Sequence, residues 1–157
     1  MDGRIYQGPC ESRPAEVLIV IPLDKTPISY RRELAADPTT YAATLTHLAT
    51  ARGSSVRALV AANPATPADA LHALCADPAP DVVRAALTHP HIDPADLQRL
   101  AKSSRTDIRA AVAMHPNTPA EVLADIAVSD KIQRVRRIAR ANPSLPDHIK
   151  AFMALSL

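Results

Sequence analysis

Arginine is the residue type whose spacing in this chain most directly suggests chemistry. Its planar guanidinium binds carboxylates and phosphates through pairs of parallel hydrogen bonds. One arginine recurs at a nearly constant interval along the chain: Arg31, Arg57, Arg84, Arg109 and Arg136. Carboxylates stand near two of these positions, at Asp81 and Asp107. We expect a structural ladder in which the arginines pair with carboxylates or helix C-terminal carbonyls of neighbouring units; the alternative is a stripe that tracks phosphates.

A second set of basic residues is concentrated near the C-terminal end of the sequence. Residues 131–150 contain six basic residues and a single acidic one, Asp147, although the whole chain carries a net charge of only +2. Clustered basic charge without nearby acids is the electrostatic footprint of polyanion binding. The expected anion-binding patch, for which a solvated face is the alternative, consists of Lys131, Arg134, Arg136, Arg137 and Arg140.

Histidines offer a different chemistry, metal coordination. His89 and His115 hold the same place in successive copies of one turn, and His91 lies close by. In other copies this place is held by Asp37, Asn63 and Asn142. All five residues belong to types that hydrogen-bond their own turn. We therefore expect a structural role at this position and no metal site.

Motifs typical of enzymes are missing from the sequence. There is no Ser/His/Asp order, no paired-carboxylate motif and no metalloprotease motif. With three glycines, the chain has no glycine-rich phosphate loop. The two cysteines, Cys10 and Cys75, are far apart, which indicates neither a disulfide framework nor a thiolate metal motif and is typical of a reducing compartment.

These side chains are positioned by a unit that recurs along most of the sequence and is clearest between Val56 and Asp77. Its anchoring prolines recur at an almost unchanging interval: Pro38, Pro64, Pro90, Pro116 and Pro143. A fixed period of about 26 residues is typical of a solenoid of stacked repeats. We predict an all-α solenoid of about five such repeats over residues 30–157.

Each repeat is expected to contain two helices. Apolar residues at helical spacing mark a short first helix over residues 56–62, which ends before Pro64 because the residue preceding proline disfavours the α region. Thr66 followed by Pro67 is typical of an N-cap and a first helical position. The expected N-caps are Thr66, Asp93 and Thr118, the last within a capping box. The apolar stripe of the second helices is formed by Leu71, Leu74, Leu97, Leu100, Leu123 and Ile126.

The recurring pattern Val-Arg-x-x-Val-Ala-x-Asn/His-Pro-x-Thr-Pro-x-x-x-Leu-x-x-Leu resembles the leucine-rich repeat variant family, which is related in form to HEAT-like helical solenoids. The resemblance covers residues 30–157 and implies a right-handed superhelix of alternating α and 3₁₀ helices. We assign the 3₁₀ geometry to the short helix bounded by proline. Some members carry an iron–sulfur cluster on an N-terminal cysteine group. Only Cys10 precedes the repeats here, so four thiolates cannot be assembled and no cofactor is expected.

The two ends of the chain depart from the repeat pattern. Residues 1–29 contain a short apolar run at 17–21 and are expected to form an irregular cap over the first repeat, the alternative being a partner-binding strand. The last repeat ends on the apolar segment 152–157, which suggests either a homo-oligomer joined through apolar termini or a fraying terminal helix. No signal peptide or membrane span is recognisable, so we expect a soluble, cytoplasmic protein.

These features favour a non-catalytic binding or scaffolding module for a protein or peptide partner, because extended repeat surfaces suit such partners. The alternative is sequence-nonspecific nucleic-acid binding through the basic C-terminal repeat. Some HEAT-like solenoids are DNA glycosylases, but chemistry on a base requires aromatic stacking surfaces. The chain has no tryptophan, one phenylalanine and three tyrosines. We therefore expect no enzyme activity, no cofactor and no membrane association.

Overall fold

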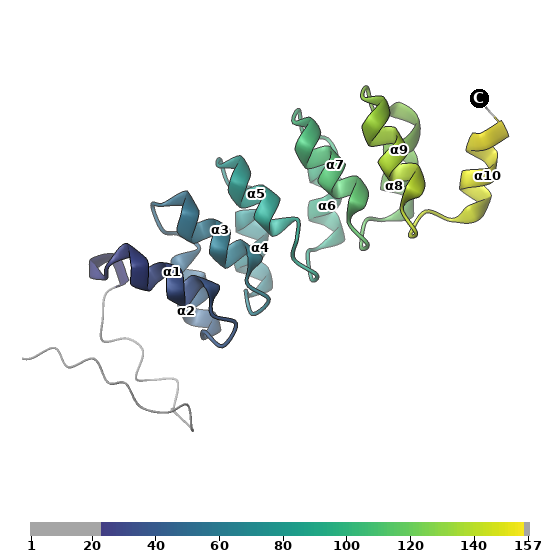
Figure 1. Cartoon of the computed structure of the whole chain (residues 1–157). Helices are drawn as coiled ribbons and strands as arrows, with labels where there is room; N and C mark the ends of the chain where they lie inside the picture. Colours follow the sequence, from purple (N-terminus) through teal and green to yellow (C-terminus); the bar gives the residue numbers. More distant parts are fainter. Residues whose placement is uncertain (1–22, 156–157) are drawn as a thin grey trace, which may run out of the picture.

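The computed structural model describes residues 23–155, which form an all-helical array (Figure 1). A 3₁₀ turn, η2 (Leu23–Lys25), precedes ten α-helices. Their bounds are α1 (Ile28–Ala36), α2 (Ala42–Leu48), α3 (Ser54–Ala62), α4 (Ala68–Leu74), α5 (Pro80–Ala86), α6 (Pro94–Leu100), α7 (Thr106–Met114), α8 (Ala120–Ser129), α9 (Gln133–Ala141) and α10 (Asp147–Leu155). The regular spacing confirms five two-helix repeats. The expected cap at residues 1–29 lies mostly outside the described residues, as do the side chains of residues 152–157.

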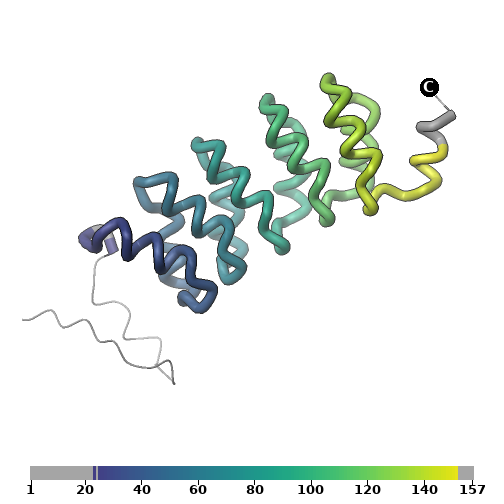
Figure 2. Tube along the Cα trace, in the orientation of Figure 1, coloured from purple at the N-terminus to yellow at the C-terminus, as the bar shows by residue number. Residues whose placement is uncertain are grey.

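The helices are arranged in two rows. Figure 1 shows α1, α3, α5, α7 and α9 side by side, with α2, α4, α6 and α8 behind them. Each odd-numbered helix packs against the next odd-numbered helix, and each of α2, α4, α6 and α8 packs against the first helix of the following repeat. The trace in Figure 2 follows the same up-and-down path in successive repeats. This arrangement confirms the predicted helical solenoid. Within the part of the chain that the structure describes, no helix is long and apolar enough to span a bilayer.

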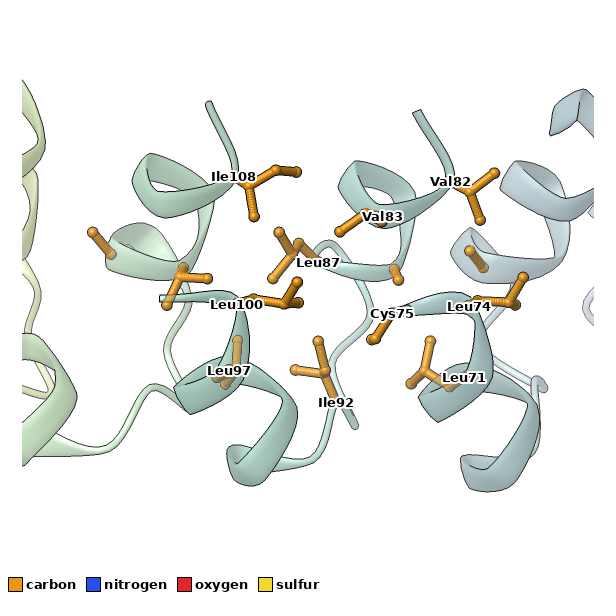
Figure 3. Close-up of a cluster of buried hydrophobic side chains, with 14 of the residues drawn as sticks. Leu71, Leu74, Cys75, Val82, Val83, Leu87, Ile92, Leu97, Leu100 and Ile108 are labelled. Carbon is orange, nitrogen blue, oxygen red and sulfur yellow. The ribbon is translucent and has the colours of Figure 1, made fainter. Parts of the chain in front are cut away.

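Leucines at one position of the second helices form the centre of the core. Leu45, Leu71, Leu97 and Leu123 are each at most 2% exposed. Figure 3 shows Leu71 and Leu97 with Leu74, Leu100 and Ile108 between the helices of successive repeats. Full burial of one such side chain stabilises the fold by about 2 kcal/mol. The core is therefore shared between repeats, and no helix pair buries its apolar face alone.

Cys75 belongs to this core and is 1% exposed. Its burial raises the pKa of the thiol to about 12, and the Asp96 carboxylate raises it further. Because the thiolate is the reactive form of cysteine, Cys75 is an inert packing residue, as its small counterparts in other repeats suggest.

The threonines do not cap the second helices, so the predicted N-caps at Thr66 and Thr118 are wrong. Thr66 Oγ1 donates to the carbonyl of Val60 at 2.5 Å, and Thr118 Oγ1 donates to the carbonyl of Val112 at 2.6 Å. Each hydroxyl thus satisfies a carbonyl that the end of the first helix leaves without a partner. The second helices begin after the following proline without a side-chain cap. The Asp93 cap is confirmed, because its carboxylate accepts from the Ala95 N–H at 2.7 Å.

Both helices of each described repeat are α-helices, so the assignment of 3₁₀ geometry to the short first helix is also wrong. The first helix α3 has nine residues and the second helix α4 has seven. Within α4 the Cys75 N–H donates to the carbonyl of Leu71, a bond of the α type. Bonds of the tighter 3₁₀ type close this helix, where the Asp77 N–H donates to the carbonyl of Leu74.

The last helix, α10, stands apart from α8 and α9 (Figures 1 and 2). The Leu123 N–H donates to the carbonyl of Pro119 at the start of α8, and the Lys150 N–H makes the equivalent bond to Pro146 at the start of α10. Lys150 therefore holds the place of the buried leucine, and its ammonium group pairs with Asp147 at 3.2 Å. Burying an unpaired ammonium group in this core would be costly, so lysine at this position disfavours docking of α10 in the manner of its counterparts, although Ile149 packs against the core.

Candidate anion-binding groove

Two members of the predicted arginine ladder form closely matched contacts. Arg57 donates from Nε and Nη2 to the Asp77 carboxylate at 2.6 and 2.9 Å, and Arg109 donates to Asp130 at 2.7 and 3.2 Å. Nη1 of Arg57 also donates to the carbonyl of Ala51 at the end of the preceding repeat. Nη1 of Arg109 makes the equivalent bond to the carbonyl of Ser103. Each guanidinium therefore joins a carboxylate of its own repeat to the end of the repeat before it.

These contacts shift the acid–base equilibria in the expected directions. The hydrogen bonds from Arg57 hold the pKa of Asp77 below its ordinary value, and those from Arg109 do the same for Asp130. The pKa of each arginine is raised by its carboxylate. All four side chains are at most 14% exposed. These arginines are structural and are not available to a phosphate backbone.

In the third repeat Arg84 pairs with Asp81 and Asp107, the two carboxylates expected near the ladder, but its helical position differs from that of Arg57 and Arg109. The N–H groups of Arg57, Arg109 and Val83 make the same bond, to the residue that precedes their helix. The structural equivalent of Arg57 is therefore the buried Val83, because α5 begins at Pro80 and places Arg84 one position further on. Arg84 is half exposed, bonds Asp81 on its own helix and lies 3.9 Å from Asp107.

A second ladder runs through the turns that follow the first helices. The Asn63 amide donates to the carbonyls of Ala35 and Asp37 in the preceding repeat, and its oxygen accepts from the Ala65 N–H. In the third repeat His89 Nδ1 accepts from the His91 N–H at 3.1 Å, so Nε2 carries the proton and lies 3.2 Å from the carbonyl of Asn63. The predicted bond to the same turn is confirmed, and a bond to the preceding repeat accompanies it. Among residues 23–155, no group of three or more potential ligands could hold a metal ion.

Replacing His89 with asparagine is expected to reduce the loss of stability in mild acid. Burial lowers the pKa of His89, and the nearby His91 lowers it further. As pH falls below about 6.5, the unfolded chain takes up a proton that the buried imidazole excludes, so stability decreases until pH reaches the folded-state pKa. The loss of stability is the difference between the free energies of unfolding measured in urea at pH 7.5 and at pH 5. His89→Asn, which copies Asn63, should lose less stability than wild type, whereas an equal loss would contradict the assignment. The exposed His91→Asn is the control.

A buried carboxylate that the sequence did not single out joins the second helices of two repeats. Asp96, in α6, is 2% exposed. Its carboxylate lies 2.9 Å from Nδ1 of His72 in α4 and accepts from Arg99 at 2.6 Å. Both oxygens are therefore satisfied, and the cluster acts as a tie between repeats two and three.

The basic residues of α9 line an open groove of about 400 Å³. The lining residues are Gln133, Arg134, Arg136, Arg137 and Arg140. Positions 133, 136, 137 and 140 fall on one face of a helix because they are three or four residues apart. Four of the five residues predicted for the patch thus come together. Lys131 does not line this groove, and Gln133, which the charge pattern could not reveal, does.

The four arginines of the groove make no ion pair with a carboxylate in the described part of the chain. Arg136 Nη1 donates to the main-chain carbonyl of Asp130 at 2.6 Å, and Arg140 Nε donates to that of Ala127 at 3.2 Å. Arg134 and Arg137 are exposed. Two guanidinium groups are therefore held in place by carbonyls while the other two extend into solvent, and no carboxylate is among the described residues that line the groove.

The groove is open because α9 is the last helix of its row. The position of Arg140 is held in the other repeats by Ala35, Ala61, Leu87 and Ala113, all at most 5% exposed. Each of those helices is followed by another first helix, whereas among the described residues none follows α9 and α10 stands apart. The arginines therefore supply a polar outer face at this end of the described array.

The stacked two-helix units and their side-chain ladders define the chain as a helical repeat solenoid. One unit carries the sequence of a named family: the family model described as leucine rich repeat variant matches residues 55–79, which include most of α3 and all of α4. That repeat, at residues 55–79, is similar to the leucine rich repeat variant model, in line with the resemblance of the sequence pattern. No curated protein and no solved structure matches the chain.

Proposed function

We propose that this protein is a non-catalytic binding module that holds an acidic segment of a partner protein in the groove along α9. The observation that carries the proposal is the set of four arginines in one groove with no carboxylate partner among the described residues. A flexible acidic peptide can place its carboxylates against these forked donors and form bidentate pairs. Two widely separated cysteines fit a reducing compartment such as the cytoplasm.

A nucleic acid is the second candidate, because the same guanidinium groups would also contact phosphates. The surface favours the peptide. A helix of nine residues is about 13 Å long and reaches only a few phosphates of a duplex. The groove is lined by arginine and glutamine side chains and lacks an aromatic residue on which a base could stack.

Fluorescence anisotropy with a labelled oligoglutamate peptide and a labelled random duplex tests the proposal. Arg134→Glu with Arg137→Glu should weaken peptide binding about tenfold or more, because each reversal turns an attraction of about 1 kcal/mol into repulsion. Both side chains are exposed, so the fold should persist. The control, Arg32→Glu with Lys102→Glu, makes the same change of net charge at exposed positions elsewhere.

Three results are informative. Peptide binding that the groove variant loses and the control variant keeps would support the proposal. Tighter binding of the duplex, with a steep dependence on salt, would favour the nucleic-acid candidate. Failure to bind either probe at low salt, or an intrinsic turnover by the purified chain, would overturn the proposal.

A further inference from the structure

The first repeat contains the arginine of the ladder without its acid. The separation in sequence between arginine and acid is 20 for Arg57 and Asp77 and 21 for Arg109 and Asp130. The residue at the corresponding position after Arg31 is Ala51, whose methyl group cannot accept a hydrogen bond. The place that a carboxylate fills in repeats two and four therefore has no acceptor in repeat one.

Arg31 occupies the same helical position as the two paired arginines. Its N–H donates to the residue before α1, as those of Arg57 and Arg109 do in their helices. Its Nε atom is buried and has no hydrogen-bond partner among the described residues. Leaving a buried donor on a charged group unsatisfied is costly. The third repeat avoids this cost, because Val83 stands at the arginine position and Ser103 at the acid position.

An open groove of about 660 Å³ lies at this vacant position. Its polar side chains are those of Arg31, His47, Thr50 and Arg52, and its accessible apolar side chains are those of the half-buried Leu23 and the exposed Ile28. No carboxylate is among the described residues that line it. A ligand that fits must therefore bring a carboxylate for the guanidinium and an apolar group for the adjoining surface.

We propose that this groove binds an aspartate or glutamate side chain of a peptide, flanked by an apolar residue. The chain itself provides the template. Asp77 reaches Arg57 from a short turn in which its carboxylate also accepts from the Ala79 N–H at 2.8 Å, and the apolar Leu74 precedes that turn. A peptide that copies this turn places its carboxylate against Arg31. The site lies at the opposite end of the array from α9 and does not depend on the groove there.

The probe is a blocked peptide that copies residues 74–80 with alanine in place of Cys75, Leu-Ala-Ala-Asp-Pro-Ala-Pro. A matched peptide with asparagine in place of aspartate is the control. NMR of isotope-labelled protein follows the Nε–H resonance of Arg31, which is assigned by its disappearance in Arg31→Gln. We expect the aspartate peptide to shift this resonance and to bind about tenfold more tightly than the asparagine peptide. The Arg134→Glu/Arg137→Glu variant should respond equally, which separates this site from the groove on α9.

A second variant supplies the acid within the chain. Ala51→Asp should form the pair that Arg57 makes with Asp77, raise the midpoint of thermal unfolding by about 3 °C and abolish the response to the peptide. Ala51→Asn introduces a side chain of similar size without the charge, and it should neither raise the midpoint of unfolding nor abolish the response to the peptide. The proposal is overturned if the aspartate peptide leaves the Arg31 resonance unchanged, if inorganic phosphate shifts it while the peptide does not, or if Ala51→Asp and Ala51→Asn behave alike.

Discussion

Asp77→Asn is expected to lower the free energy of unfolding by about 2 kcal/mol. The variant keeps the size of the side chain but removes the negative charge that accepts both hydrogen bonds from Arg57. Removing one partner of a fully buried ion pair costs about 3–5 kcal/mol, since the other charge stays behind in a poor solvent. The Arg57 side chain is 14% exposed and keeps its bond to the carbonyl of Ala51, so a smaller loss is expected here.

Urea denaturation at neutral pH measures this loss, and Asp81→Asn is its control. Asp81 also pairs with an arginine, but its side chain is 69% exposed and that of Arg84 is 51% exposed. Exposed pairs contribute about 0–1 kcal/mol because water screens them. If the two variants lose equal stability, the Arg57–Asp77 contact does not hold the repeats together in the way described above.

The pH dependence provides an independent check on the same pair. Arg57 holds the pKa of Asp77 below its ordinary value in the folded state. The contribution of Asp77 is therefore fully present above the pKa of an unfolded aspartate, about 3.9, and is lost as pH falls through the lower folded-state value. Wild type and Asp77→Asn should consequently differ most at neutral pH and converge below about pH 4.

The repeated elements of this fold were predictable because each local signal occurs several times. Prolines at a fixed period identify five helix pairs, leucines mark one position of the second helix in four of them, and the recurring arginines indicate a ladder. The predicted N-caps were wrong where one side chain can hydrogen-bond either of two backbone groups. The Thr66 hydroxyl could cap the following helix or bond the carbonyl of Val60, and only the path of the turn decides between them.

The position of Arg84 illustrates a second limit. Aligning Arg84 with Arg57 requires a one-residue gap in the sequence of the third repeat. In the structure α5 begins without such a gap, and Val83 therefore stands at the position that Arg57 holds in α3. Residue type alone could not choose between the two alignments. The basic cluster of α9 was visible as charge, but the groove that its arginines line is a product of packing, since among the described residues no first helix follows α9.

Lys150→Leu is expected to dock α10 onto the array and to stabilise the protein by about 2 kcal/mol, the gain from burying one leucine side chain. Leucine stands at this position in the other four repeats and is at most 2% exposed there. The ion pair between Lys150 and Asp147 would be lost, but the Asp147 side chain is 98% exposed, so its contribution is small.

Thermal unfolding measures the stability of this variant, and hydrogen exchange of the α10 amides reports whether the helix has docked. Lys150→Ala is the matched control, because it removes the ammonium group without supplying the leucine and should leave α10 apart. Slower exchange in Lys150→Leu than in Lys150→Ala would show that one side chain decides the position of the last helix. Equal exchange in the two variants would mean that other residues of α10 keep it apart.

The same variant links the end of the solenoid to the proposed function. If α10 docks against α9 as α2 and α4 pack against the first helices of their own repeats, and reaches the surface around Arg137 and Arg140, it covers part of the groove. Binding of an acidic peptide should then weaken although no arginine has changed. A stabilised variant with unchanged peptide binding would place the docked helix away from the groove, and the lysine would then affect only the stability of the last repeat.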